Sequence, residues 1–200
     1  MSYNPYDFYF KQAKKVWYKA RSAFKLEEIQ EKFHIIDKNV KTVIDIWCAP
    51  WSRMQYTTSL LQKMHVKDFQ VFWFDLKKVD LKLPWLHTYV QDITDQEKVM
   101  AIMAENWIEQ VDFIQSDMAP NTIWDKEIDA MRSIALLEET LWVYETYLKP
   151  DWKFCTKIFM WPGFDEYVSR LKKRFGGKSI KVFKPESCRR ESKETYVIKI

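Results

Sequence analysis

The sequence predicts an α/β fold, a seven-stranded and mostly parallel sheet with helices on both faces. Short β-branched and aromatic runs alternate with longer amphipathic segments along most of the chain, which is typical of parallel strands joined by crossover helices. The last two predicted strands have no helix between them, so we expect an antiparallel hairpin at one edge of the sheet. A chain of 200 residues, 47% of them hydrophobic, can bury the core of one such domain.

The individual elements follow from residue periodicity. Apolar residues recur at helical spacing between Phe24 and Phe33, within a basic N-terminal helical extension that we assign to residues 1–36. The sheet and its helices are expected in residues 37–200, within a single domain of residues 1–200. The predicted strands are residues 42–47, 70–75, 87–91, 111–116, 153–159, 179–184 and 194–200. The predicted helices that follow the extension are residues 53–65, 95–106, 126–148 and 164–175.

Basic residues are concentrated in two segments near opposite ends of the chain. Residues 11–25 contain Lys and Arg but no acid, and residues 170–199 are also strongly basic, although the net charge is only +4. Aromatic side chains lie among these residues, so we favour nucleic-acid binding over the alternative of two solvated helix faces. The candidate RNA-binding residues are Lys14, Lys15, Lys19, Arg21, Arg189 and Arg190.

Composition also indicates a cellular compartment and excludes some partners. The apolar runs are too short to cross a bilayer, and no signal-peptide pattern opens the chain, so we expect no membrane partner. The three cysteines form neither an even disulfide framework nor a CxxC pair, which is typical of a reduced, cytoplasmic protein. The three histidines lack metal-ligand spacing, so we expect no metal site.

Acidic residues stand at or near the ends of four successive predicted strands. Asp45 lies in the first strand, and Asp75, Asp92 and Asp117 close the next three. Ligands of open α/β sheets bind beyond the carboxyl ends of the strands. A carboxylate after the second strand can accept hydrogen bonds from both hydroxyls of a ribose, and one after the third can meet an adenine amino group. A single aspartate in such a place is more often a helix cap, but four in succession favour a nucleoside site.

Seven short motifs, spread over nearly the whole chain, resemble those of the FtsJ/RrmJ family of ribosomal RNA large-subunit methyltransferases, also called RlmE. They are A-F-K-L-E-E-I at 23–29, D-I-W-C-A-P-W-S at 45–52, S-D-M-A-P-N at 116–121, K-I-F at 157–159, G-F-D-E-Y at 163–167, F-K-P-E-S at 183–187 and K-E-T-Y-V-I at 193–198. The resemblance implies a Rossmann-like methyltransferase fold with S-adenosylmethionine as methyl donor. It also implies a monomer whose partner is ribosomal RNA in the large subunit and whose acceptor is a uridine ribose 2′-hydroxyl. A nicotinamide dehydrogenase is disfavoured because the turn after the first strand lacks a G-x-G-x-x-G equivalent.

The same resemblance assigns roles to individual residues. The family's Lys-Asp-Lys-Glu catalytic tetrad matches Lys25, Asp117, Lys157 and Glu194, with Lys157 as the base. A ribose hydroxyl is a weak nucleophile and needs a positioned proton acceptor, which explains these residue types. The residues that the resemblance implies around the cofactor are Trp47, Trp51, Arg53, Asp75, Asp92 and Asp117.

Tryptophan stands where this family pattern has glycine at many positions. The chain has 3 glycines and 10 tryptophans, whereas an average chain of this length has about 14 glycines. One hypothesis is that most of these tryptophans are glycine in the living cell, encoded by UGA, which different lineages read as stop, tryptophan or glycine. The alternative is that the chain is as written. It would then be a non-catalytic RNA-binding or ribosome-assembly protein whose cofactor pocket is blocked by Trp47 and Trp51, although the complete tetrad favours an enzyme.

Overall fold

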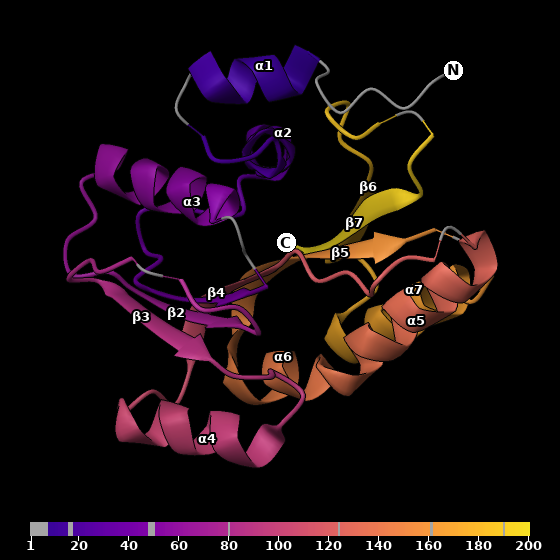
Figure 1. Cartoon of the computed structure of the whole chain (residues 1–200). Helices are drawn as coiled ribbons and strands as arrows, with labels where there is room; N and C mark the ends of the chain where they lie inside the picture. Colours follow the sequence, from indigo (N-terminus) through magenta and orange to yellow (C-terminus); the bar gives the residue numbers. More distant parts are fainter. Residues whose placement is uncertain are drawn as a thin grey trace.

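A seven-stranded sheet forms the centre of the computed structural model, which describes residues 8–15, 18–47, 51–79, 81–123, 125–160, 162–189 and 191–200 (Figure 1). The strands are β1 (Thr42–Ile46), β2 (Gln70–Asp75), β3 (Leu86–Val90), β4 (Val111–Ser116), β5 (Leu148–Phe159), β6 (Ile180–Phe183) and β7 (Glu194–Lys199). The helices are α1 (Phe8–Lys15), α2 (Ser22–Phe33), α3 (Ser52–Lys63), α4 (Gln96–Glu105), α5 (Lys126–Glu139), α6 (Leu141–Tyr147) and α7 (Phe164–Phe175).

The strand order is β3-β2-β1-β4-β5-β7-β6. Strands β1 to β5 pair in parallel, whereas β7 pairs antiparallel with both β5 and β6. This arrangement confirms the mostly parallel sheet and the antiparallel pair at one edge that the sequence predicts. The order of strands reverses between β1 and β4, so the carboxyl ends of these two strands flank the point where open α/β sheets bind ligands.

Two groups of helices cover the two faces of the sheet (Figure 1). Helices α2 and α3 bury residues such as Leu26 and Leu61 against one face, and α4 to α7 pack on the other. Successive strand residues point to opposite faces, and accordingly Val43 packs with α2 and α3 while Ile44 belongs to the opposite core. Both faces of the central strands are therefore apolar, which explains their nearly continuous β-branched and aromatic sequences.

The largest differences from the predicted boundaries are in β5 and in the helical segment before it. Strand β5 begins at Leu148, earlier than the predicted residue 153, and the single helix predicted for residues 126–148 is divided into α5 and α6 at Thr140. The Thr140 hydroxyl donates to the carbonyl oxygens of Leu136 at 3.0 Å and Leu137 at 3.2 Å. Such side-chain bonding to the preceding turn competes with the regular helix. The helical spacing of apolar residues therefore continues past Thr140, although α5 ends before it.

The described residues contain neither a membrane-spanning helix nor a metal cluster. Within those parts of the chain, none of the helices has the length and apolar character that a bilayer crossing requires. Helix α5, for example, has 14 residues, whereas a transmembrane helix needs about 20. The same residues contain no group of three or more His, Cys, Asp or Glu side chains placed to hold a metal ion.

Candidate active site

Four charged side chains from different elements meet at the carboxyl end of the parallel strands. Lys25 of α2 places its Nζ 2.5 Å from Oε1 of Glu194, the first residue of β7. Lys157 of β5 places its Nζ 3.1 Å from Asp117 Oδ1 and donates to the backbone carbonyl of Asp117 at 2.5 Å. The structure thus brings together, as two ion pairs, the four residues that the family resemblance singled out.

The alternation of strand residues explains why these side chains converge. Asp117 follows Ser116, the last residue of β4, and its backbone N–H donates to the end of β1 at 3.1 Å. In the antiparallel register of β5 and β7, Lys157 lies opposite Tyr196. Glu194 is two residues before Tyr196, so both belong to the same face of β7. Tyr196 itself packs in the core with α2 and α3, which places the cluster on the face that these helices cover.

Tyr196 is a member of this cluster that the sequence analysis missed. Its hydroxyl donates to Glu194 Oε1 at 2.6 Å and lies 3.4 Å from Asp117 Oδ1, so it bridges the two acids. Burial, together with Glu194 and Asp117, raises the pKa of Tyr196 well above its ordinary value, so the phenol stays protonated and remains a donor. The i, i+2 spacing from Glu194 was the signal that could have revealed it.

Electrostatics keep both acids of the cluster ionised. The side chains of Lys25, Lys157 and Glu194 are 11 to 13% exposed, and that of Asp117 is 20% exposed. Burial acts to raise the pKa of Asp117, but Lys157, Arg53 and Lys25 outweigh it and hold that pKa below its ordinary value. Burial likewise acts to raise the pKa of Glu194, while Lys25 and Lys157 hold it below its ordinary value.

Arg53 lies beneath the cluster, whereas the resemblance implied that it contacts the cofactor. Its side chain is 1% exposed, and its Nη1 donates to the Ser116 carbonyl at 2.7 Å and lies 3.6 Å from Asp117 Oδ1. Its Nη2 donates to Cys155 Sγ at 3.5 Å. A planar guanidinium offers several donors at once, so Arg53 satisfies buried acceptors under the cluster and presents no surface to a bound cofactor in this arrangement.

Asp75 and Asp92 stand beyond the carboxyl ends of two neighbouring strands. Asp75, the last residue of β2, is 5% exposed, accepts from the Lys77 N–H at 2.9 Å, and lines a cavity of about 160 Å³ together with Trp73. Asp92 follows β3, and its Oδ1 accepts from the N–H and the hydroxyl of Thr94 at 2.9 and 2.8 Å. Carboxylates at this edge fit a nucleoside that offers hydroxyl and amino donors.

The turn between β1 and α3 carries Trp47 and Trp51, and residues 48–50 lie outside the described parts of the chain. Trp47 has φ 56° and Trp51 has φ 63°, both in the left-handed region that glycine occupies without a steric penalty. The Trp47 N–H donates to the Phe74 carbonyl of β2 at 2.9 Å, and this hydrogen bond holds the start of the turn against the neighbouring strand. Both indoles are half-buried. The carboxylates of the site therefore suit the cofactor better than this turn does.

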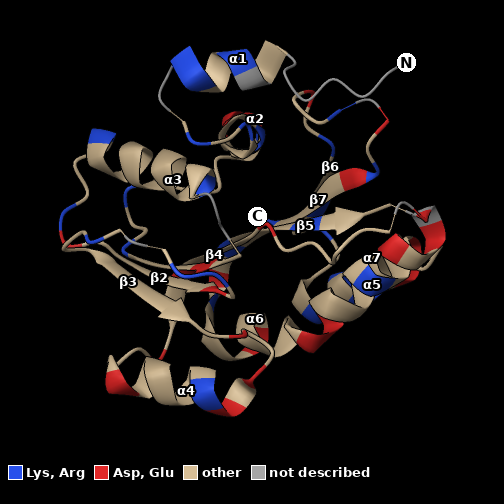
Figure 2. Cartoon of the chain, viewed as in Figure 1, with Lys and Arg blue, Asp and Glu red and all other residues tan. Residues whose placement is uncertain are grey.

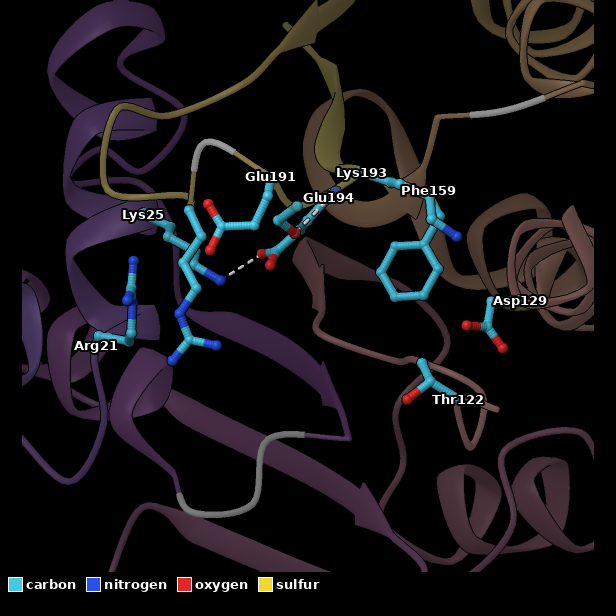
Figure 3. A pocket seen from close by; sticks show the side chains of 10 residues that line it. Arg21, Lys25, Thr122, Asp129, Phe159, Glu191, Lys193 and Glu194 are labelled. Carbon is cyan, nitrogen blue, oxygen red and sulfur yellow. Dashed lines mark hydrogen bonds and ion pairs between the residues drawn. The ribbon is translucent and has the colours of Figure 1, made fainter. Parts of the chain in front are cut away.

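A pocket of about 510 Å³ opens in front of Lys25 and Glu194 (Figure 3). This volume falls within the range of about 300–1,000 Å³ that is typical of ligand sites. Arg21 and Arg189, from the two basic segments at opposite ends of the chain, both line it. Figure 3 shows Phe159 on the far side of the pocket from Arg21 and Lys25. The structure thus brings two of the candidate RNA-binding residues to one opening beside the tetrad.

The remaining candidate RNA-binding residues lie away from this pocket or outside the described residues. Lys14 and Lys15 are exposed in the last turn of α1, which is coloured as basic in Figure 2. Lys19 is exposed, and its Nζ lies 5.6 Å from the centre of the Trp51 ring. Arg190 falls on a position whose structure is not described.

Comparison with known sequences identifies the family. Residues 18–200 match the model of the FtsJ-like methyltransferase family. The chain is 36% identical over 192 residues to ribosomal RNA large subunit methyltransferase E of Desulfatibacillum aliphaticivorans, an alignment that covers 96% of this chain and 88% of that protein. It is 35% identical over 199 residues to the protein of the same name from Syntrophobacter fumaroxidans, covering 99% of this chain and 96% of the relative.

Solved structures share the fold. The chain superposes with a TM-score of 0.74 on a putative ribosomal RNA methyltransferase from Plasmodium falciparum, at 22% identity and with 91% of this chain and 97% of that chain covered. The TM-score is 0.55 with human methyltransferase-like protein 13 in complex with SAH, at 11% identity over 86% of this chain and 79% of that chain. These likenesses confirm the predicted fold. The sequence matches confirm the resemblance that the motifs indicated, with its enzyme class and its S-adenosylmethionine donor, and the chain belongs to the FtsJ-like methyltransferase family.

Proposed function

We propose that the protein transfers a methyl group from S-adenosylmethionine to the 2′-hydroxyl of a uridine ribose in large-subunit ribosomal RNA. The observation that carries this proposal is the cluster of Lys25, Asp117, Lys157 and Glu194 at the switch point of the sheet. The relatives named ribosomal RNA large subunit methyltransferase E support the choice of RNA. In this proposal a monomeric single domain, with residues 1–36 as its basic extension, acts in the cytoplasm on RNA in the large ribosomal subunit.

Lys157 is the proton acceptor in this reaction. When bound, S-adenosylmethionine supplies a methyl group on a positively charged sulfur, and the ribose oxygen forms the new O–C bond as the S–C bond breaks and leaves its electron pair on sulfur. The hydroxyl proton passes to Lys157 Nζ, which must be a neutral amine to receive it. Asp117, 3.1 Å from this nitrogen, orients the amine and pairs with the ammonium that the proton transfer creates.

Lys25 and Glu194 position the acceptor nucleotide. Both line the pocket of about 510 Å³, where the Lys25 ammonium attracts a phosphate oxygen and the Glu194 carboxylate accepts a hydrogen bond from a ribose hydroxyl. The hydrogen bond from Tyr196 and the ion pair with Lys25 fix the Glu194 carboxylate in one orientation. Arg21 and Arg189 supply positive charge for the RNA backbone at the same opening.

The acids at the strand ends hold the cofactor. Asp75 accepts from the two ribose hydroxyls of the adenosine part, and Asp92 accepts from the adenine amino group. Asp117 attracts the positively charged methionine part. The half-buried indoles of Trp47 and Trp51 border the turn that approaches this ligand, and they favour one competing function, a non-catalytic RNA-binding protein with a blocked cofactor pocket.

A transfer assay with labelled cofactor tests the proposal. The protein is incubated with methyl-tritiated S-adenosylmethionine and large ribosomal subunits from a cell that lacks the modification, and the labelled site is mapped by its resistance to alkaline hydrolysis. We expect label on a single uridine ribose, and far less label in the same time with Lys157→Ala protein. Label on a base would refute the proposed chemistry. RNA binding without any transfer would instead support the non-catalytic alternative.

A further inference from the structure

We infer that Arg53 is a positioning residue that keeps Asp117 ionised and in place while Lys157 is a neutral amine. The inference rests on the proposed function because it takes Lys157 as the base. It concerns a residue that lies under the tetrad and, in this arrangement, presents no surface to the cofactor.

Two cations flank the Asp117 carboxylate from different elements. Lys157 of β5 approaches Oδ1 at 3.1 Å, and Arg53, in the first turn of α3, approaches the same atom at 3.6 Å. The Arg53 guanidinium also donates to the carbonyl of Ser116 at 2.7 Å. Arg53 therefore contacts both the carboxylate and the preceding peptide, so it restrains the direction in which Asp117 leaves β4.

The burial of Arg53 argues against a purely structural role. Its side chain is 1% exposed, beside the buried Cys155 and with its guanidinium carbon 5.4 Å from the centre of the Tyr196 ring. Removing a guanidinium from water is costly, and apolar side chains of similar volume often stabilise such a site equally well. The feature that an apolar residue cannot supply here is a positive charge next to Asp117.

That charge is needed when the base changes its protonation state. A lysine that is to accept a proton must first be neutral, and at that stage it gives Asp117 no positive charge. The other titratable groups that face Asp117 are Lys25 of α2, Cys155 and Lys157 of β5, and Glu194 and Tyr196 of β7. Lys25 is engaged by Glu194 at 2.5 Å. A guanidinium stays charged at every pH at which proteins fold, so Arg53 is a constant source of positive charge for Asp117.

The sign of the expected change follows from this arrangement. Arg53 is one of the cations that lower the pKa of Asp117 against the effect of burial, so its removal raises that pKa. A protonated Asp117 cannot pair with the Lys157 ammonium. Loss of Arg53 therefore shifts the acid limb of the reaction to higher pH and slows the chemical step, while binding of the RNA stays unchanged.

Arg53→Met, Arg53→Lys and the control Arg174→Met test this inference. Arg174 is 61% exposed on α7 and pairs with Glu145 at 2.6 Å, so its loss removes one positive charge far from the tetrad. The Asp117 carboxyl is titrated by carbon NMR in the protein without substrate, and single-turnover methyl transfer is measured across pH. We expect a raised Asp117 pKa and a rate loss of about 10-fold to 100-fold in Arg53→Met, as for a displaced reacting group. Arg53→Lys should restore part of both, and Arg174→Met should change neither.

The two readouts separate this inference from the proposed function. An unchanged Asp117 titration or an unchanged rate in folded Arg53→Met protein overturns the inference. Should Arg53→Met not fold, the same two measurements on Arg53→Lys decide it. If the wild-type protein transfers no methyl group but the titration of Asp117 still shifts, the proposed function fails while the electrostatic role of Arg53 stands.

Backbone conformation supports a second, independent inference. Eight described residues have φ in the left-handed region, and these are His34, Trp47, Trp51, His65, Asp68, Trp107, Gly163 and Gly176. Tryptophan occupies three of these positions, one more than glycine. A left-handed conformation is a genuine outlier for a bulky side chain, whereas glycine adopts it freely.

Trp107 gives the clearest example of a position shaped for glycine. It follows Asn106, the C-cap of α4, and its N–H donates to the Ala104 carbonyl at 3.0 Å. The next N–H, of Ile108, donates to the Met103 carbonyl at 3.0 Å. This pair of bonds defines a Schellman motif, in which the left-handed residue is usually glycine. The Trp107 side chain is 91% exposed, so no packing compensates for the strain.

We propose that Trp47, Trp51 and Trp107 are glycine in the cell that makes this protein, encoded by UGA codons that its ribosomes read as glycine. UGA is a stop codon in the standard code and denotes tryptophan in some lineages and glycine in others. A sequence written with the tryptophan reading loses glycine, gains tryptophan and does so at glycine turns. The chain has these features, with 3 glycines and 10 tryptophans. The proposal does not include Trp142, because this residue lies inside α6, where glycine would destabilise the helix.

Codons and native peptide masses test this second inference directly. UGA codons together with peptides of glycine mass at the three positions are the expected result, with UGG and tryptophan mass at Trp142. UGG codons, or peptides of tryptophan mass from the source cell, overturn it. A physical check uses Trp107→Gly, which should raise the midpoint of thermal unfolding, against Trp142→Gly, which should lower it. A lower midpoint of thermal unfolding for Trp107→Gly would show that the left-handed backbone at this position does not favour glycine.

Discussion

Lys157 contacts Asp117 twice, through the carboxylate at 3.1 Å and the carbonyl at 2.5 Å. Because the same amine must take the ribose proton, Lys157→Ala should reduce methyl transfer by about 10²-fold or more, the usual effect of losing a general base. Cofactor affinity should hardly change. Single-turnover kinetics and calorimetry with S-adenosylmethionine measure the two quantities, and Lys172→Ala, an exposed change on α7, is the control. Full activity in Lys157→Ala would remove this residue from the mechanism.

Glu194 should make the stability of the protein depend on pH. Its pKa in the folded state lies below its ordinary value, so its ionised form stabilises the fold above the unfolded pKa of about 4.3. That contribution is lost as the pH falls through the lower, folded value. Glu194→Gln should therefore reduce the free energy of unfolding at pH 7, and the difference from wild type should shrink in acid.

Urea unfolding at a series of pH values measures this difference. Glu139→Gln, an exposed change on α5, should behave as wild type at every pH. A difference between Glu194→Gln and wild type that stays constant from neutral pH into acid would show that the Glu194 charge is not the cause.

At the scale of single residues, the sequence predicted which residues form the site, but it predicted less well how their side chains are arranged. Family motifs singled out Lys25, Asp117, Lys157 and Glu194, and the structure brings them within hydrogen-bonding distance. A sequence motif does not show which way a side chain points, however. The Arg53 side chain points inward because its guanidinium donates to buried acceptors, the Ser116 carbonyl and Cys155 Sγ. Tyr196 could have been found from strand alternation once Glu194 was placed on a strand.

The turn between β1 and α3 is the element in which sequence and expected function conflict most. Trp47 and Trp51 hold left-handed conformations at its two ends, beside the expected approach of the cofactor. We expect the double change Trp47→Gly and Trp51→Gly to increase affinity for S-adenosylmethionine, measured by calorimetry. Trp107→Gly is the matched control, because it relieves the same strain at the end of α4 and should leave this affinity unchanged. Equal affinities for the double variant and the wild type would show that the indoles do not block the site.

The elements themselves were largely predictable because their periodicities are strong. Strands buried on both faces read as β-branched and aromatic runs, and the absence of a helix between β6 and β7 indicated their antiparallel pairing. The division between α5 and α6 was not predictable in this way. The apolar stripe continues through Thr140, and what ends α5 is a local hydrogen bond from the Thr140 hydroxyl to the preceding turn.

Over the whole molecule, the chain brings its two basic segments together at one pocket. Arg21 and Arg189 line the same opening, and Lys14 and Lys15 are further basic residues in the last turn of α1 (Figure 2). Charge reversal at Lys14, Lys15 and Arg21 should weaken RNA binding and leave S-adenosylmethionine binding intact. The slope of log affinity against log salt should become shallower by about 0.7 to 0.9 for each RNA phosphate that the variant no longer neutralises.

Binding measured at several salt concentrations checks this prediction. Charge reversal at Lys38 and Lys67, which are exposed before β1 and β2 and lie outside both basic segments, adds the same kind of charge at the other ends of the strands and should have little effect. A flat salt dependence in the wild-type protein would favour two solvated helix faces over an RNA-binding surface.

The position of β7 also determines when the protein can first act. This strand follows β6 in the chain but lies between β5 and β6 in the sheet, and it carries both Glu194 and Tyr196. A nascent chain that has grown only as far as β6 has an unpaired edge on β5 and no carboxylate for Lys25. The tetrad therefore cannot assemble until β7 has been made and has inserted between β5 and β6.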